Sequence, residues 1–236
     1  MTLMTEFTSK DLYSTYKVRE QAQGTERRIP YIDAWIRCHM PQDRSAIILD
    51  IGCGRGLLLS RLQRFGYTAL RGVDASPSQY QHRVTDITEL CDAMEALRAI
   101  STGSQDVVIA FDVIEHLSTK DLLSLSAEVY RVLRTTGRWV VHVPNGSGLF
   151  GTHALYGDLT HERAFTQSSL NQLAEISGFR RIAAFEDVPC RHGVLSWCRW
   201  LVWRIGRVFL LFLWAAETGS FSDALFSQNF TAVFWK

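Results

Sequence analysis

The stretch that decides the fold is IILDIGCGRGLLLS, residues 47–60, in which a short apolar run meets three glycines at alternate positions. Gly52, Gly54 and Gly56 follow the apolar run, and a leucine-rich segment begins at Leu57. Because glycine has no Cβ, such a loop turns sharply and lets a ligand approach its backbone closely. A glycine loop between a strand and a helix lies at the carboxyl end of a parallel sheet, where open α/β folds bind ligands. The stretch therefore predicts an α/β protein with a ligand at this loop.

The spacing of the glycines argues against a nicotinamide dinucleotide as that ligand. The dinucleotide fingerprint GxGxxG needs its third glycine at position 57, where this chain has leucine. The third glycine comes one residue early, and the sequence has no obvious Tyr-xxx-Lys arrangement for hydride transfer. A dehydrogenase is therefore the least favoured interpretation.

Hydrophobic patterns on both sides of the loop alternate between strand and helix. Short apolar runs predict strands over 46–51, 70–73, 87–90, 106–111, 138–143, 180–186 and 229–235. Helical spacing predicts helices over 57–65, 118–133 and 166–177. Glycine follows the first and the last of these helices, as is typical of a helix C-terminus. The alternation predicts a doubly wound, mostly parallel sheet, whose last strand runs antiparallel.

Four motifs, in the right order, give the chain a resemblance to a known family. LDIGCGRG at 49–56 resembles the first motif of class I S-adenosylmethionine-dependent methyltransferases, and GVDAS at 72–76 continues it. CDAMEAL at 91–97 matches the acidic motif that meets the adenine, and QDVVIAFDVIEHL at 105–117 is similar to the fourth-strand motif of small-molecule members. The resemblance covers roughly residues 45–185. It implies a Rossmann-like, seven-stranded methyltransferase fold with S-adenosylmethionine as cofactor.

The resemblance also implies which residues hold the cofactor. Asp74 would take the ribose hydroxyls, Asp92 would meet the adenine amino group, and Asp50 would hold the loop or the methionine ammonium. The implied set is Asp50, Gly52, Cys53, Gly54, Gly56, Asp74, Ala75, Asp92, Ala93 and Phe111. A structural alternative stays open for each carboxylate: a helix cap at Asp74, a surface acid at Asp92 and a loop cap at Asp50.

Candidates for the acceptor chemistry stand at the same edge of the predicted sheet. Methyl transfer to a hydroxyl needs alignment, exclusion of water and a base. His116, His153 and His161 all follow predicted strands, and Asp158 stands three residues before His161. We predict His161, His116 and Asp158 as catalytic, with His161 as the general base, and Asn145 and His153 as substrate-binding. For the histidines, ordering of the local loop is the alternative.

The sequence predicts no metal site. Asp112, His116, Asp158 and His161 form a mixed set of the kind that binds several divalent ions, but no tight spacing joins them. The cysteines number five, and no pair of them has CxxC spacing. This pattern predicts reduced, mostly buried thiols and argues against zinc.

Charge and leader patterns restrict the partners and the compartment. Lys+Arg is 25 and Asp+Glu is 24, so the net charge is 25 − 24 = +1, which gives no footprint for nucleic acid. The opening MTLMTEFTSK has no apolar core of the kind found in a signal peptide. We therefore expect a cytoplasmic protein that acts on a small-molecule or glycan acceptor.

A late apolar segment, residues 194–216, interrupts the passage between the last two predicted strands. Arg199, Arg204 and Arg207 divide it, and the uncharged remainder is much shorter than the about 20 residues that a membrane span needs. Arginine and tryptophan together suit a helix that lies in a membrane interface. This interpretation places the enzyme peripherally on the inner membrane face. A homodimer interface and packing on the protein's own core are the alternatives.

The organisation predicted from these patterns has four parts. They are an N-terminal helical lid (1–45), a methyltransferase core (46–187), an apolar helical insertion (188–227) and the last strand of the core sheet (228–236). Tyr13, Tyr16 and Arg28 are candidate lid contacts to the cofactor, although a packed arm would show the same helical spacing.

Three functions remain open at this stage. The segment YGDLTHERAFTQSSL at 156–170, with VPNGSGLFG before it, resembles methyltransferases found with polysaccharide and lipopolysaccharide assembly genes. That resemblance implies O-methylation of a sugar hydroxyl in a surface polysaccharide or its lipid-linked precursor. Methylation of a quinone-like or other membrane-associated small molecule is the second interpretation, although the strand end here is VPN rather than the NR of quinone methyltransferases. A non-catalytic cofactor-binding scaffold is the third.

Overall fold

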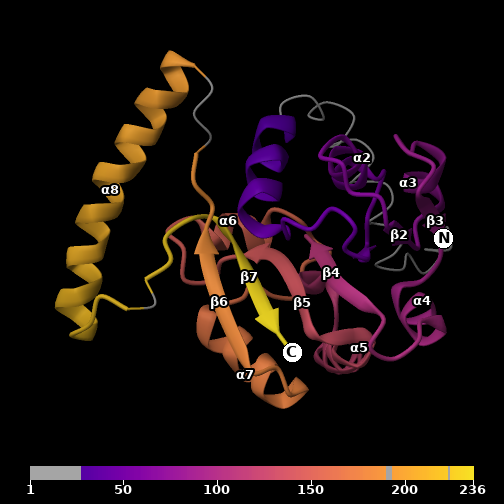
Figure 1. Cartoon of the computed structure of the whole chain (residues 1–236). Helices are drawn as coiled ribbons and strands as arrows, with labels where there is room; N and C mark the ends of the chain where they lie inside the picture. Colours follow the sequence, from indigo (N-terminus) through magenta and orange to yellow (C-terminus); the bar gives the residue numbers. More distant parts are fainter. Residues whose placement is uncertain (1–27, 190–192, 223) are drawn as a thin grey trace, which may run out of the picture.

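A seven-stranded sheet forms the centre of the computed structural model, which describes residues 28–189, 193–222 and 224–236 (Figure 1). Its strands are β1 (Ile48–Ile51), β2 (Leu70–Asp74), β3 (Thr88–Leu90), β4 (Gln105–Phe111), β5 (Leu133–Pro144), β6 (Arg181–Glu186) and β7 (Asn229–Trp235). They lie in the order β3-β2-β1-β4-β5-β7-β6. All neighbouring pairs are parallel except those of β7, which runs antiparallel to β5 and β6. The predicted doubly wound sheet and its antiparallel last strand are confirmed.

Helices connect the strands. They are α2 (Leu57–Arg64), α3 (Pro77–Gln81), α4 (Ala93–Ala99), the 3-10 helix η1 (Ile114–His116), α5 (Thr119–Val132), α6 (Gly151–Tyr156), α7 (Gln167–Ser177) and α8 (Val194–Thr218). A further helix over residues 28–39 precedes β1. The sequence located the long helices to within a few residues because their ends carry clear signals. The side chain of Ser118 caps α5 and that of Thr166 caps α7, while Gly178 ends α7 in a left-handed conformation.

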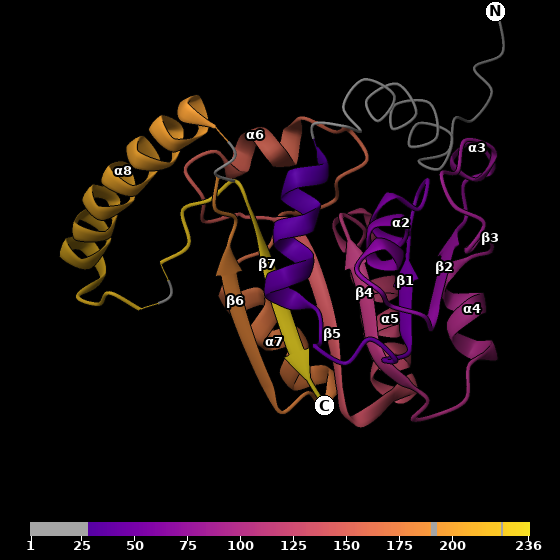
Figure 2. The same cartoon turned by 45° about the horizontal axis from the view of Figure 1, so that its top comes forward.

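Two hydrophobic clusters cover the two faces of the sheet. On one face, α4, α5 and α7 bury side chains such as Leu97, Leu125 and Leu170 against Trp139 and Phe234. On the other, the helix over 28–39 and α2 bury Ile32, Trp35, Ile36, Leu58 and Leu62 against Ile48, Ile109 and Val140. Figure 2 shows the indigo helix in front of the strands and α5 and α7 behind them. This double cover leaves the carboxyl edge of the parallel strands as the place for a site.

The described part of the predicted lid is a sheet-covering helix. Trp35 is buried, and its indole Nε1 donates to Thr231 Oγ1 on β7 at 2.8 Å. At the start of this helix, Arg28 reaches the carboxyl edge, where its guanidinium lies 3.3 Å from Asp112 Oδ2. Tyr13 and Tyr16 lie outside the described residues, so their lid role stays a prediction.

The helix α8 stands away from the sheet, as the gold helix in Figures 1 and 2 shows. It falls in the predicted apolar insertion between β6 and β7, but Ser196 is its one buried residue. Packing on the protein's own core therefore does not explain its apolar composition. One further expectation is wrong: Cys38 and Cys198 are exposed, and Cys53 and Cys91 are half-buried, so the described thiols are not mostly buried.

Candidate active site

The glycine loop after β1 adopts backbone conformations that side chains disfavour. Gly52, Gly54 and Gly56 have φ angles of 67°, 54° and 78°, all in the left-handed region. A Cβ on Gly52 would lie 2.5 Å from a methyl carbon of Val113, which follows β4. The loop therefore presents bare backbone at the carboxyl edge, close to the end of β4. Such a cradle fits a ligand that lies directly against the main chain.

Asp74 fastens this loop to the end of β2. Its Oδ2 accepts from the backbone N–H of Gly54 at 2.8 Å, and its Oδ1 accepts from the N–H of Ser76 at 2.8 Å. Burial raises the pKa of the carboxyl, and the two N–H groups partly offset that rise. Capping of α3 falls to Ser76, whose hydroxyl accepts from Gln79 N. Asp74 therefore shapes the glycine loop, and Ser76 rather than Asp74 is the residue that caps α3.

Asp50 is the unusual carboxylate of this edge. It is 1% exposed, and its Oδ1 has no hydrogen-bond partner among the described residues. Burial, with a contribution from the nearby Asp74, raises the pKa of Asp50 to about 8. An orphaned, buried carboxylate oxygen is costly unless a cation or donor meets it. The residues therefore fit a positively charged ligand such as S-adenosylmethionine, whose ammonium would find a partner here.

The remaining predicted cofactor residues line the same edge, and their roles stay predictions. Asp92 caps α4, because its Oδ1 accepts from Met94 N at 2.9 Å and from Glu95 N at 3.4 Å. Ala75 follows Asp74 directly, Ala93 begins α4, and Cys53 lies inside the glycine loop. Phe111 ends β4, where its ring stacks on that of His142 with centroids 4.2 Å apart.

A polar cluster that the sequence reasoning missed lies at the ends of β4, β5 and β6. His142 Nδ1 donates to Asp112 Oδ1 at 2.5 Å, and its Nε2 lies 2.9 Å from Asp187 Oδ2. Burial alone lowers the pKa of His142, but the two facing carboxylates outweigh it and raise the pKa to about 10. His142 is therefore a buried cation at neutral pH, and it holds two carboxylates together.

The helix over 28–39 completes this cluster. The Tyr31 hydroxyl donates to Asp187 Oδ2 at 2.8 Å and lies 3.0 Å from His142 Nε2. Burial, with the neighbouring Asp187, raises the pKa of Tyr31, so the phenol keeps its proton. Asp112 is the one described non-glycine residue with a positive φ, 56°, which marks a constrained turn after β4. The local signal was a histidine near the end of the buried strand RWVVHV. Its partners lie far away in the sequence.

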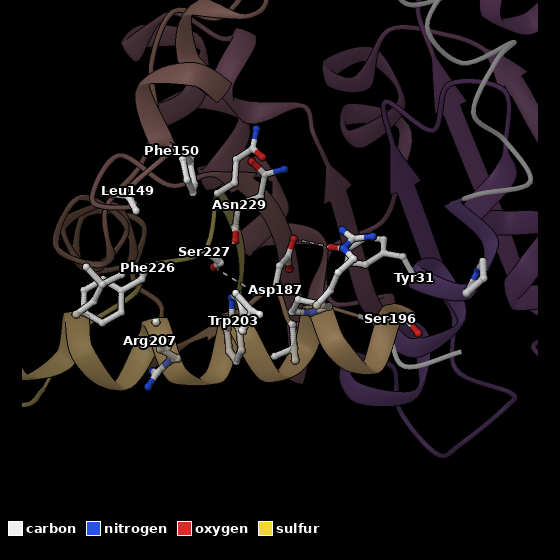
Figure 3. Close-up of a pocket in the computed structure, with 18 residues that line it drawn as sticks. Tyr31, Leu149, Phe150, Asp187, Ser196, Trp203, Arg207, Phe226, Ser227 and Asn229 are labelled. Carbon is white, nitrogen blue, oxygen red and sulfur yellow. Dashed lines mark hydrogen bonds between the residues drawn. The ribbon is translucent and has the colours of Figure 1, made fainter. Parts of the chain in front are cut away.

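A cavity of about 790 Å³ opens beside this cluster, between the sheet edge and α8 (Figure 3). Tyr31 and Asp187 form its polar end, and Figure 3 marks the hydrogen bond between them. Phe150, Trp203 and Phe226 contribute apolar walls from three separate segments. The size suits a small-molecule site.

Comparisons with known proteins identify the family. A family model described as a methyltransferase domain matches residues 24–184, well over half of the chain. The chain belongs to this methyltransferase family. The predicted superfamily, the enzyme class and S-adenosylmethionine as cofactor are confirmed.

Solved structures of the same fold are similar over nearly the whole chain. A SAM-dependent methyltransferase from Archaeoglobus fulgidus has a TM-score of 0.70 at 20% identity, and the match covers 94% of this chain and 100% of that one. Phosphoethanolamine N-methyltransferase 2 from Haemonchus contortus, solved with S-adenosylhomocysteine, has a TM-score of 0.58 at 17% identity, covering 97% of this chain and 59% of that one. At these identities the likeness shows the fold.

Curated relatives match a shorter part of this methyltransferase. The ubiquinone biosynthesis O-methyltransferase of Caulobacter vibrioides is 37% identical over 78 residues, which are 30% of this chain and 31% of that protein. The protein of the same name from Neisseria meningitidis serogroup C is 29% identical over 98 residues, 38% of this chain and 39% of the relative. The chain thus spans about a third of the length of these relatives.

The three predicted catalytic residues of the methyltransferase do lie together, on the α5 side of β4. His161 Nε2 is 3.9 Å from Asp158 Oδ2 and 4.0 Å from Oε1 of Glu115, which the prediction did not include. The rings of His116 and His161 are 4.7 Å apart. The fourth residue of the mixed set, Asp112, instead pairs with His142. Asp158 and Glu115 are buried. The cavity lining includes none of His116, His161, Asp158 and Glu115. Their catalytic roles stay predictions.

The two predicted substrate residues differ in their surroundings. His153 is exposed on α6. Asn145 is fully buried, and its side-chain NH₂ donates to the carbonyls of Leu225 and Ser227 at 2.9 and 2.8 Å. Its carbonyl oxygen accepts from Ser147 N at 3.0 Å. In this arrangement Asn145 ties the loop after β5 to the segment before β7. Its predicted contact with the acceptor, like that of His153, stays a prediction.

Proposed function

We propose that this methyltransferase transfers the methyl group of S-adenosylmethionine to a hydroxyl oxygen of an acceptor that carries an apolar chain. The cavity between the sheet edge and α8 carries this proposal. Its inner end is polar, at Tyr31 and Asp187, whereas apolar side chains such as Trp203 and Phe226 line it towards α8. Arg199 and Arg207 also line the cavity on that side. A molecule with a hydroxylated head and an apolar tail matches this division.

Contacts inside the protein link the inner end of the cavity to the donor edge. Asp187 and Tyr31 bond to His142, and the ring of His142 stacks on Phe111 at the end of β4. Two residues further on, Val113 lies against Gly52 of the glycine loop. A hydroxyl bound at Asp187 is therefore only a few side chains from the cradle that fits the donor.

The chemistry follows from the charges at this end. When bound, S-adenosylmethionine supplies an electrophilic methyl group on a positively charged sulfur. Asp187 would accept a hydrogen bond from the acceptor hydroxyl and take its proton as the new carbon–oxygen bond forms and the sulfur–methyl bond breaks, with S-adenosylhomocysteine as the leaving group. Tyr31 and the protonated His142 fix the orientation of this carboxylate, because both lie within hydrogen-bond distance of its Oδ2. The protein thus supplies alignment and a proton acceptor.

Two acceptor classes share this chemistry. A lipid-linked sugar is the first, since the segment around His161 resembles methyltransferases of polysaccharide assembly. A phenolic quinone precursor is the second, since the relatives that match at up to 37% identity are named ubiquinone biosynthesis O-methyltransferases. Both carry an apolar chain, which is the feature that the cavity favours.

The test measures S-adenosylhomocysteine formation with a lipid-linked sugar, the same sugar without its lipid, and a prenylated phenol. One tailed acceptor should turn over, and its tailless form should not. Asp187→Asn should lower kcat at least about 100-fold without weakening cofactor binding. Trp203→Ala should raise KM for the tailed acceptor, whereas Ile205→Ala, on the other side of α8, should not. Equal turnover of the tailless sugar, or full activity of Asp187→Asn, would contradict the proposal. Cofactor binding without turnover of any acceptor would favour the scaffold.

The surface of α8 that faces away from the cavity supports a membrane-borne acceptor. Its exposed apolar side chains are Val194, Leu195, Trp197, Leu201, Ile205, Val208, Phe209, Phe212 and Leu213. At 100° per residue they fall within an arc of about 160° that contains no charged residue. The helix is about 37 Å long. Arg199 and Arg204 lie at the two sides of this arc, whereas Arg207 lies on the cavity side, where it pairs with Glu186. None of the helices in the described ranges has the length and apolar character needed to cross a bilayer.

The proposed function therefore places α8 in the interface of an anionic membrane, with the protein peripheral to it. Co-sedimentation with anionic vesicles checks this placement. The wild type should sediment, and Phe209→Ser with Phe212→Ser should reduce the bound fraction several-fold. Phe185→Ser, an exposed phenylalanine on β6, is the matched control and should bind as the wild type does. A wild type that stays in the supernatant contradicts membrane docking, and concentration-dependent dimerisation lost in the double variant would assign this face to a second copy.

A further inference from the structure

Glu115, His116 and His161 bring ligand atoms of the right kind together, and Asp158 lies beside His161; these four residues are named here the His/Glu cluster. Glu115 and His116 belong to η1 after β4, and the other two residues lie in the loop after α6. One ligand atom each from Glu115, His116 and His161 lie within 4.8 Å of one another. Asp158 Oδ2 is 3.9 Å from His161 Nε2. The two imidazoles and the Glu115 carboxylate thus surround one small space, and the Asp158 carboxylate lies beside His161.

The hydrogen bonds of the two histidines orient their rings and occupy Nδ1 of each ring. His161 Nδ1 lies 2.9 Å from the carbonyl oxygen of Ala154, and His116 Nδ1 lies 3.2 Å from that of Thr160. A carbonyl oxygen only accepts, so each Nδ1 donates a proton to it, and Nε2 is the nitrogen that a metal ion would use. In His161, Nε2 is the nitrogen that faces the carboxylates of Asp158 and Glu115. Histidines that bind metal show this pattern, in which the other ring nitrogen donates to a backbone carbonyl.

The distances within the cluster suit an ion better than direct hydrogen bonds. The separations of 3.9 and 4.0 Å from His161 Nε2 to the two carboxylate oxygens exceed hydrogen-bond length. Ligand bonds of about 2.0–2.2 Å to zinc place neighbouring ligand atoms roughly 3.4 Å apart in a tetrahedron. The ligand atoms of Glu115, His116 and His161 lie within 4.8 Å of one another, so they need to approach by up to about 1.4 Å. Asp158 Oδ1 accepts from the N–H and the hydroxyl of Thr160, at 2.9 and 2.6 Å, and these bonds hold the carboxylate beside His161.

We propose that the His/Glu cluster is a structural zinc site. Two imidazoles and the Glu115 carboxylate are a ligand set that zinc accepts, and Asp158, beside His161, is placed to become the fourth ligand after a small shift. The burial of Glu115 and Asp158 agrees with a closed site. Bound zinc joins η1 to the loop that follows α6, and so restrains α6, which directly follows the cavity residues Leu149 and Phe150. A ligand role replaces the general-base role predicted for His161.

Metal binding by the purified full-length chain tests this proposal without any acceptor. After removal of metals, calorimetric titration with zinc should show one equivalent bound per chain. Cobalt should give the visible absorption bands of a low-symmetry nitrogen and oxygen site, and magnesium, which prefers oxygen ligands, should not compete. Zinc should also raise the melting temperature of the protein.

Matched variants separate the cluster from adventitious binding. His161→Ala should weaken zinc binding by more than the about 10–100-fold expected for loss of an outer hydrogen-bond partner. His153→Ala, an exposed histidine of the adjacent helix, should bind zinc as the wild type does. Glu115→Gln keeps the shape of the side chain, so it serves where His161→Ala does not fold. A wild type that takes up neither zinc nor cobalt, or undiminished binding by folded Glu115→Gln, would overturn the proposal. Either outcome is independent of which acceptor the enzyme methylates.

Discussion

The two halves of the carboxyl edge are built in different ways. Around β1 and β2, backbone groups carry the contacts, and Gly54 and Asp74 are only 20 residues apart in the sequence. Around β5 and β6, side chains carry the contacts: Tyr31 and His142 meet across 111 residues, and His142 and Asp187 meet across 45. The first half is thus a local motif, whereas the second half exists only once the whole sheet has formed.

This difference explains why the donor could be predicted and the acceptor could not. A backbone cradle needs glycine at fixed positions, so its sequence is restricted and easy to detect. A side-chain pocket can be assembled from many residue types on several elements, and its walls here come from the helix over 28–39, from the loop after β5 and from α8. Substitutions made separately in the backbone cradle and in the side-chain pocket test this difference between the two halves of the carboxyl edge.

Substitution of Gly52 by alanine should have the largest effect. The residue has a φ of 67°, and a Cβ would meet Val113 at 2.5 Å. Strain and this clash together should displace the loop and weaken binding of S-adenosylmethionine at least about 300-fold. Isothermal titration calorimetry with the cofactor and with S-adenosylhomocysteine measures this change.

Gly66 provides the matched control for backbone strain. It has a φ of 89°, but an added Cβ would meet no atom within 4 Å. Gly66→Ala should lower the free energy of unfolding by about 1 kcal/mol and leave cofactor binding unchanged. If Gly52→Ala and Gly66→Ala bind the cofactor equally well, the cradle does not depend on its glycine conformations and the local half of the comparison fails.

His142→Asn, in the acceptor half, should change how the free energy of unfolding depends on pH. The pKa of His142 is about 10 in the folded protein, above the about 6.5 of an unfolded histidine. The folded state therefore holds a proton that the unfolded state releases between these values. Its stabilising contribution is complete below pH 6.5 and is lost as the pH rises through 10. Urea unfolding from pH 6 to pH 10 should show a steeper loss of stability for the wild type than for the variant.

At pH 6, the variant should be less stable than the wild type by about 2 kcal/mol, because its two partly exposed carboxylates lose their charged donor. Asp50, whose pKa is about 8, also titrates in this range, but its contribution cancels when the two curves are subtracted. His82→Asn changes an exposed histidine and should leave the curve as it is in the wild type. Parallel curves for the wild type and His142→Asn would show that His142 is neutral in the fold.

The fold was predictable from the sequence because its signals are local. β7 matches its predicted bounds, and the predicted third strand at 87–90 is one residue longer than β3. Apolar runs, the cap residues Ser118 and Thr166, and the glycines that end helices all act within a few residues. Strand order then follows from the parallel connections and from the family motifs. The long antiparallel pairing of β5 with β7 agrees with the expected direction of the last strand.

The acceptor side was predictable only in part. His116, Asp158 and His161 were singled out by their place after strands, and they do lie together. Asp187 gave no signal, because a lone aspartate after a strand is common, and its partners Tyr31 and His142 lie on other elements. The apolar pattern of α8 predicted a long helix correctly. The pattern did not predict that most side chains of this helix would stay exposed.

The smallest expected effect concerns α8, which belongs to the acceptor half. Ile205 is 64% exposed on its outward face, whereas Ile36 of the helix over 28–39 is 1% exposed in the core. Ile205→Ala should change the free energy of unfolding by less than about 0.5 kcal/mol, since it removes almost no buried contact. The same substitution at Ile36 should cost about 3 kcal/mol. Urea unfolding in dilute, lipid-free solution measures both. A loss above about 1 kcal/mol at Ile205 would mean that this face already has a partner within the protein or in a second copy, and membrane docking would lose its main support.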